Sequence, residues 1–188
     1  MRKIQITAVA ISALLLMSAT AHAQTAAATT AEHSVAAEGG TDHGRHPSSE
    51  FRHLRRATAR YHSLPKALAD GFVAFSLDPD NPDVPTCFDS PDGGMGVHYV
   101  RNIDDTLDKN DPEALVYEVR RHGRLRLVAV EYLIPEEFVD PDDPPVLFGE
   151  TLHRHPFLPV YILHAWIWKS NPDGVFADFN PRVGACPG

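Results

Sequence analysis

The stretch Tyr161-Ile162-Leu163-His164-Ala165-Trp166-Ile167-Trp168 decides the fold, because it is an apolar run with one histidine in its middle. We interpret it as a β-strand, in which side chains alternate between two faces. One face would then carry Ile162, His164, Trp166 and Trp168. The other face is equally apolar, so the strand is predicted to lie in the interior, where His164 must find a polar partner.

Two other apolar stretches contain a polar residue in the same way. His98 lies within residues 96–100, and Glu131 lies within residues 127–133. Buried polar groups are normally paired, so three of them in three apolar strands suggest that they meet. The sequence therefore predicts an interior site built from His98, Glu131 and His164.

Two histidines and one carboxylate are typical ligands of a divalent transition metal. Zinc, iron, manganese and copper all accept this donor set, and the sequence does not choose among them. His153 and His155 are one residue apart and would point to the same side of a strand, so either could add a ligand. The competing interpretation is that His98 and His164 are ordinary core histidines that pair with Glu131 or with an arginine.

Glu118 is a fourth candidate, but the predicted register excludes it. A hairpin that turns at His122-Gly123 would pair Glu131 with Ala114 and Glu118 with Leu127. The two carboxylates would then lie about 13 Å apart along the sheet, too far to share one ion. Arg120, two residues from Glu118, offers it an ion pair instead.

The rest of the sequence predicts one α+β domain over residues 48–188. Residues 51–68 carry apolar side chains at helical spacing with arginines between them, and Gly71 suits the end of a helix. Most of the later segments read as strands, and residues 77–94 read as a proline-rich acidic loop. We expect an N-terminal amphipathic helix packed on a mainly antiparallel curved sheet or small barrel.

The N-terminus has the pattern of a secretory signal peptide. Arg2 and Lys3 precede an apolar segment, and Ala21-His22-Ala23 suits cleavage after Ala23. Residues 1–23 are therefore predicted to be the signal peptide, and the mature protein to be secreted or periplasmic. Residues 24–47 contain almost no large apolar side chains, so we predict a disordered tail.

The protein has two cysteines, Cys87 and Cys186. An even number of cysteines in an exported protein predicts a disulfide. It would close a loop of about 100 residues and stabilise the fold by about 4–5 kcal/mol. A catalytic cysteine is correspondingly not expected.

Charge and missing motifs exclude several classes of function. The formal net charge of −8 at pH 7 disfavours binding to nucleic acid. Beyond the signal peptide no apolar run is long enough for membrane insertion. The sequence lacks the nucleophile elbow of serine hydrolases, the glycine-rich loops of nucleotide-binding proteins and the attachment motif of c-type haem.

Three strand motifs together resemble one family. They are Gly93-Gly94-Met95-Gly96-Val97-His98-Tyr99, Arg124-Leu125-Arg126-Leu127-Val128-Ala129-Val130-Glu131-Tyr132, and Leu163-His164-Ala165-Trp166-Ile167-Trp168 followed by Asn171-Pro172-Asp173-Gly174. The protein resembles a family of exported bacterial proteins of unassigned activity over about residues 55–186. The resemblance implies export and a shared core, but no particular fold, cofactor or catalytic residue.

The function predicted from the sequence is an exported metal-binding protein with an interior mononuclear site. If it is an enzyme, which the sequence leaves open, the ion would activate water or oxygen, with Tyr99 or Glu118 as a supporting group. The alternative is a metal-free module that binds a small ligand or a partner around a structural core. The sequence does not specify the small molecule or the oligomeric state.

Overall fold

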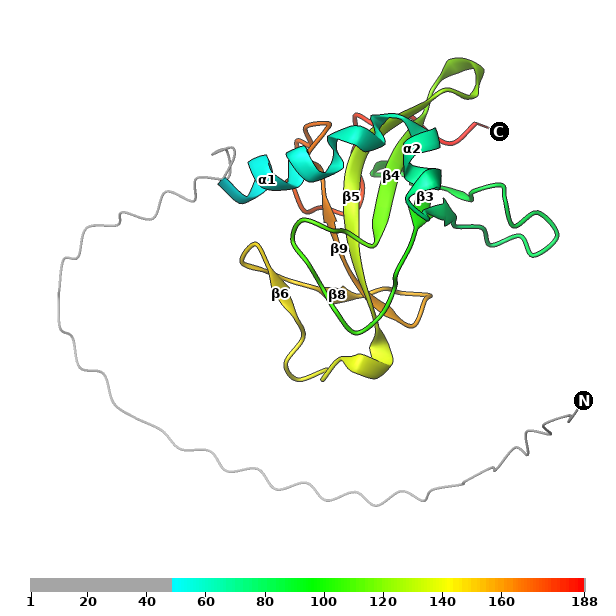
Figure 1. The fold of residues 1–188 in the computed structure, drawn as a ribbon. Helices are drawn as coiled ribbons and strands as arrows, with labels where there is room; N and C mark the ends of the chain where they lie inside the picture. The colour runs from blue at the N-terminus through cyan, green and yellow to red at the C-terminus, as the bar shows by residue number, and fades with distance from the viewer. Residues whose placement is uncertain (1–48, 188) are drawn as a thin grey trace, which may run out of the picture. The chain divides into compact units, whose positions relative to one another are not determined.

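The computed structural model describes residues 49–187, so the predicted signal peptide and most of the predicted tail lie outside the described residues. The described part begins with three short helical segments (Figure 1). They are α1 (Ser49–Thr58), the 3-10 turn η1 (Ala59–His62) and α2 (Leu64–Ala69). Pro65 lies in the first turn of α2, where a missing backbone N–H costs nothing, so a new helix starts there.

A seven-stranded sheet follows the helices. Its strands are β1 (Val73–Ala74), β2 (Cys87–Ser90), β3 (Gly93–Val100), β4 (Ala114–Val119), β5 (Leu125–Pro135), β8 (His153–Arg154) and β9 (Val160–Ala165). They lie in the order β1-β3-β4-β5-β9-β8 with β2 also paired to β3, and every pairing is antiparallel. Two 3-10 turns, η2 (Arg121–Gly123) and η3 (Glu136–Phe138), flank β5, while β6 (Val146–Leu147) and β7 (Glu150–Thr151) form a separate pair.

The predicted α+β class with a mainly antiparallel sheet is confirmed. Within residues 49–187 the sheet is open, so the barrel alternative is wrong. One face of the sheet packs against the helical segments, where the Tyr117 hydroxyl donates a hydrogen bond of 2.6 Å to the Tyr61 carbonyl. Because side chains alternate, residues one position away from this core point to the opposite face.

The β4–β5 hairpin turns where the sequence predicted, at His122 and Gly123, both of which have positive φ. Glu131 pairs with Ala114, as expected. A bulge shifts the register between Val116 and Tyr117, so Glu118 pairs with Arg126 and the predicted pairing with Leu127 is wrong.

The segment that follows β9 folds back onto β3 as it runs toward the C-terminus. Gly94 N–H donates to the Val183 carbonyl at 3.2 Å, and Asn180 N–H donates to the Gly94 carbonyl at 3.0 Å. The predicted disulfide between Cys87 and Cys186 is present, with Cα atoms 5.8 Å apart. It ties this C-terminal segment to β2, a strand that lies within the predicted loop of residues 77–94.

Candidate metal centre

Strands β3, β5 and β9 bring His98, Glu131 and His164 together on the face of the sheet opposite the helices. Glu131 on β5 lies directly across from His164 on β9. His98 is on β3, one strand farther away, and β4 runs between β3 and β5. On β4, Ala114 pairs with Glu131 and Val116 pairs with His98, so His98 and Glu131 are offset by two residues along the sheet.

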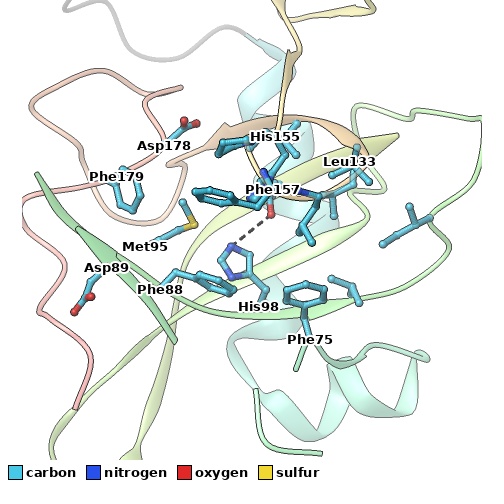
Figure 2. A pocket seen from close by; sticks show the side chains of 17 residues that line it. Phe75, Phe88, Asp89, Met95, His98, Leu133, His155, Phe157, Asp178 and Phe179 are labelled. Carbon is cyan, nitrogen blue, oxygen red and sulfur yellow. Dashed lines mark hydrogen bonds and ion pairs between the residues drawn. The ribbon is translucent and has the colours of Figure 1, made fainter. Parts of the chain in front are cut away.

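The donor atoms of these three residues converge as predicted. His98 Nε2 lies 3.4 Å from Glu131 Oε2, the pair joined by the dashed line in Figure 2, and His164 Nε2 lies 3.5 Å from Glu131 Oε1. One donor atom from each residue lies within 4.8 Å of the other two. Two atoms bonded to the same ion at about 2.1 Å are about 3.4 Å apart at a tetrahedral angle, so the spacing suits one metal ion.

The three side chains are buried and poorly satisfied. His98 and Glu131 are each 5% exposed, and His164 is fully buried. Among residues 49–187, His98 Nδ1 and both ring nitrogens of His164 have no hydrogen-bond partner. Buried polar atoms in an ordinary core are almost always paired, so these rings do not behave as satisfied core histidines.

Burial sets the protonation of His98 and Glu131. It lowers the pKa of His98 to about 3, with the neighbouring His164 and His155 adding to the effect. His98 is therefore a neutral imidazole at physiological pH, the form that binds metals. Burial also raises the pKa of Glu131, because nothing nearby fully offsets the loss of solvation of its carboxylate.

His164 responds differently because it lies between two carboxylates. Burial alone would lower the pKa of His164, but the negative charges of Glu131 and Asp178 outweigh it and raise that pKa. A positive charge at this position is thus favoured by its surroundings. A divalent cation beside His164 would meet the same two carboxylates.

Asp178 connects the buried cluster to the surface. Its Oδ1 lies 3.4 Å from His164 Nδ1, and its Oδ2 is hydrogen-bonded to His153 Nε2 at 3.2 Å. Burial would raise the pKa of Asp178, but its contacts with His153 and His164 hold that pKa well below its usual range. A carboxylate on the second nitrogen of a metal-binding histidine fixes the ring and increases its basicity.

His153 and His155 do not join the cluster of donor atoms. His153 contacts Asp178, and His155 Nδ1 accepts hydrogen bonds from the backbone N–H groups of Phe157 and Leu158 at 3.1 and 3.0 Å. His155 therefore shapes the turn before β9.

Glu118 lies outside the cluster, as the sequence predicted. It forms ion pairs with Arg120 at 3.3 Å and with Lys169 at 2.5 Å. The expectation that Glu118 or Tyr99 supports the site is wrong, because Tyr99 packs edge-on against Tyr117 in the core on the opposite face.

Trp168 is also not on the face of His164, because β9 ends at Ala165 and the alternation ends with it. Its ring packs against His62 and its Nε1 donates to the Thr58 hydroxyl at 3.3 Å, both on the helical side. The residue that the sequence analysis missed is Asp178. It lies in an irregular segment, where no periodic pattern could have pointed to it.

Comparisons with known proteins identified no protein similar to this one. A scan against protein-family models, a search of curated proteins and a search of solved structures each found no match to this protein. In the described part of the sequence, none of the helices has the length and apolar character needed to cross a bilayer.

Proposed function

We propose that this protein binds one divalent transition-metal ion in the interior of its sheet, through His98, Glu131 and His164. The observation that carries the proposal is the convergence of His98 Nε2 and His164 Nε2 on the two oxygens of the buried Glu131 carboxylate. Among residues 49–187, His164 Nε2 has no hydrogen-bond partner. An ion held between these two nitrogens and Glu131 would satisfy His164 Nε2. It would also balance the two negative charges of Glu131 and Asp178.

The proposal extends to catalysis, because three protein ligands leave coordination positions open. A cavity of about 270 Å³ reaches both His98 and Glu131, so water or a small molecule could approach these positions. Such an ion would activate water or oxygen. His98, Glu131 and His164 would hold the ion, and Asp178 would orient His164.

Metal analysis tests this proposal directly. Protein without a histidine tag, loaded in turn with zinc, iron(II), manganese and copper and then desalted, should retain about one equivalent of the preferred metal. Chelation should lower the melting temperature, since an ion that binds only the folded state stabilises it. The variant His164→Gln should bind far less metal and should lose the sensitivity to chelator.

His53→Gln is the matched control, because His53 is an exposed histidine on α1, far from the cluster. It should bind metal and respond to chelator as the wild type does. A wild-type protein that retains none of the four metals and melts identically with and without chelator would favour the metal-free binding module instead.

We also propose that the protein is exported, as the resemblance to exported bacterial proteins implies. The disulfide supports this, because such bonds persist in oxidising compartments. N-terminal sequencing of the mature protein from its own cells should begin at Gln24. Recovery of the intact protein with Met1 or Arg2 at its start would contradict cleavage.

A further inference from the structure

The cavity beside the candidate metal centre has mainly apolar walls. Phe75, Phe88, Met95, Leu133, Phe157 and Ile162 are among the side chains that line it, and Figure 2 shows several of these around His98. His98 and Glu131 supply the polar end of the same cavity. An apolar pocket with a few convergent polar groups is the usual form of a small-molecule site.

The size of the cavity limits what it can hold. A cavity of about 150 Å³ accepts one benzene molecule. The 270 Å³ found here has space for one fused two-ring molecule of about ten non-hydrogen atoms. Phenylalanine rings on several sides favour an aromatic occupant, because edge-on and offset ring contacts add to the burial of apolar surface.

The charges around the cavity argue against an ionic occupant. Its lining contains neither lysine nor arginine, and Glu131 and Asp178 would already balance the charge of a divalent ion, so an anion would find no uncompensated positive charge there. The two acids in the lining besides Glu131 are already engaged. Asp89 accepts the Cys186 N–H at 2.7 Å, and Asp178 contacts His153 and His164. A neutral molecule avoids the cost of removing a charge from water.

Phe157 extends the apolar lining of the cavity to the protein surface. It lines the cavity, yet 89% of its surface is exposed. The backbone N–H of Phe157 is held by His155 Nδ1, so the turn that carries this ring is fixed. An exposed aromatic ring that continues the apolar lining of a pocket enlarges one contiguous apolar surface, and such surfaces mark binding sites.

We propose that this cavity binds a neutral, mainly aromatic molecule of about ten non-hydrogen atoms, with one oxygen atom directed at His98 and Glu131. The apolar part of the proposal stands on the cavity alone. The oxygen atom rests on the proposed function, because it would occupy an open position of the metal ion.

The test uses 1-naphthol as the probe, titrated calorimetrically into the metal-loaded full-length protein. We expect saturable binding with one molecule per protein molecule. Naphthalene-1-sulfonate and 1-naphthylmethylammonium have the same rings but carry a charge, and they should bind at least about tenfold more weakly. Naphthalene itself should bind with or without metal. Removal of the metal should lower the affinity for 1-naphthol.

Two variants locate the binding. Phe157→Ser should lower the affinity for 1-naphthol about threefold to tenfold. The control Phe138→Ser removes another exposed phenylalanine, outside the cavity lining, and should leave this affinity unchanged. Val160→Trp should occupy part of the cavity and weaken binding of 1-naphthol. Val160 is only partly buried, so a larger side chain there should be tolerated. If Val160→Trp does not fold, Phe157→Ser alone tests whether binding occurs at the cavity. Each variant should keep the metal content of the wild type.

Absence of saturable 1-naphthol binding to metal-loaded protein would overturn the inference, as would equal or tighter binding of either charged analogue. Equal weakening by Phe157→Ser and Phe138→Ser would also overturn it, because binding would not be at the cavity. Binding of naphthalene by protein that takes up no metal would support the cavity and defeat the proposed function, so the two failures are distinguishable.

Discussion

Glu131 shares its two carboxylate oxygens between His98 and His164, which differ in protonation. His98 is neutral because burial lowers its pKa to about 3, whereas the negative charges of Glu131 and Asp178 keep the pKa of His164 above its ordinary value. Without a metal, a proton on His164 can balance only part of the charge of the two carboxylates. Asp178 therefore influences how strongly this position attracts a cation.

Replacing Asp178 with Asn should weaken metal binding about 10–100-fold, since loss of the outer partner of a ligating histidine has effects of this size. Affinity can be measured by competition with a chromogenic chelator. Asp173→Asn removes the same charge from an exposed turn and should leave the affinity unchanged. Equal affinities of the Asp178→Asn variant and the wild type would show that Asp178 does not act through His164.

Glu113 gives a pH dependence of stability that is separate from the metal centre. It is 5% exposed, its Oε2 accepts the Leu133 N–H at 3.1 Å, and burial raises its pKa to about 7 from 4.5. The folded state then binds more protons than the unfolded state between these values. Its contribution is fully present below pH 4.5 and is lost as pH rises through 7, by about 3 kcal/mol.

The variant Glu113→Gln should therefore lose less stability than the wild type between pH 5 and pH 8. Urea unfolding at the two pH values, with chelator present, measures the difference. Glu137→Gln, at an exposed position, should behave as the wild type does. An identical change in unfolding free energy for Glu113→Gln and wild type would contradict the assignment.

Among the elements, β3 is shaped to accept the C-terminal segment. A Cβ atom on Gly94 would lie 2.5 Å from the Gly184 carbonyl oxygen, and one on Gly93 would lie 2.5 Å from the Asn180 backbone. Glycine is needed here because another backbone approaches closely. The same segment carries Asp178, so these glycines help to bring Asp178 to His164.

Gly94→Ala should destabilise the fold by about 1–3 kcal/mol, the usual effect of overpacking, and should also weaken metal binding by displacing the segment that holds Asp178. Gly184→Ala is the matched control, because a Cβ there meets no atom within 4 Å and its φ is not in the positive region. Thermal melts and chelator competition measure both effects. Wild-type stability and metal affinity in Gly94→Ala would show that the close contact is not rigid.

The periodic elements of this fold could be predicted from the sequence, and the irregular ones could not. The apolar strand patterns predicted that His98, Glu131 and His164 lie on strands, and their polar character within those strands predicted that they meet. The β4–β5 bulge depends on packing between strands, which leaves no mark in the alternation. Asp178 reaches His164 only because the backbone folds back along β3 after β9, and no local pattern encodes that return.

At the scale of the whole molecule, the disulfide closes a loop that contains every strand of the sheet from β3 onward. Cys87 and Cys186 are separated by 99 residues, and between them lie β3, β4, β5 and β9. Linking distant residues restricts the unfolded state more than linking near ones. It also holds the C-terminal segment, and Asp178 with it, beside β2.

The double variant Cys87→Ser/Cys186→Ser should lose about 4–5 kcal/mol of unfolding free energy, as the chain-entropy model gives for a loop of this length. Denaturant titration measures the loss. Wild-type protein kept reduced with dithiothreitol should match the double variant. Unfolding free energies that agree between oxidised and reduced wild type would show that the bond adds no net stability.

The two-faced sheet also has an evolutionary consequence. On β9, Tyr161, Leu163 and Ala165 belong to the core on the helical face, whereas Ile162 and His164 are buried on the opposite face, where the cavity lies. Selection can therefore act differently on neighbouring codons of one strand, on stability at one codon and on ligand choice at the next. Substitutions at Ile162 should alter what the cavity accepts, whereas substitutions at Leu163 should mainly alter stability. The ligand specificity of this fold could therefore change without a prior increase in its stability.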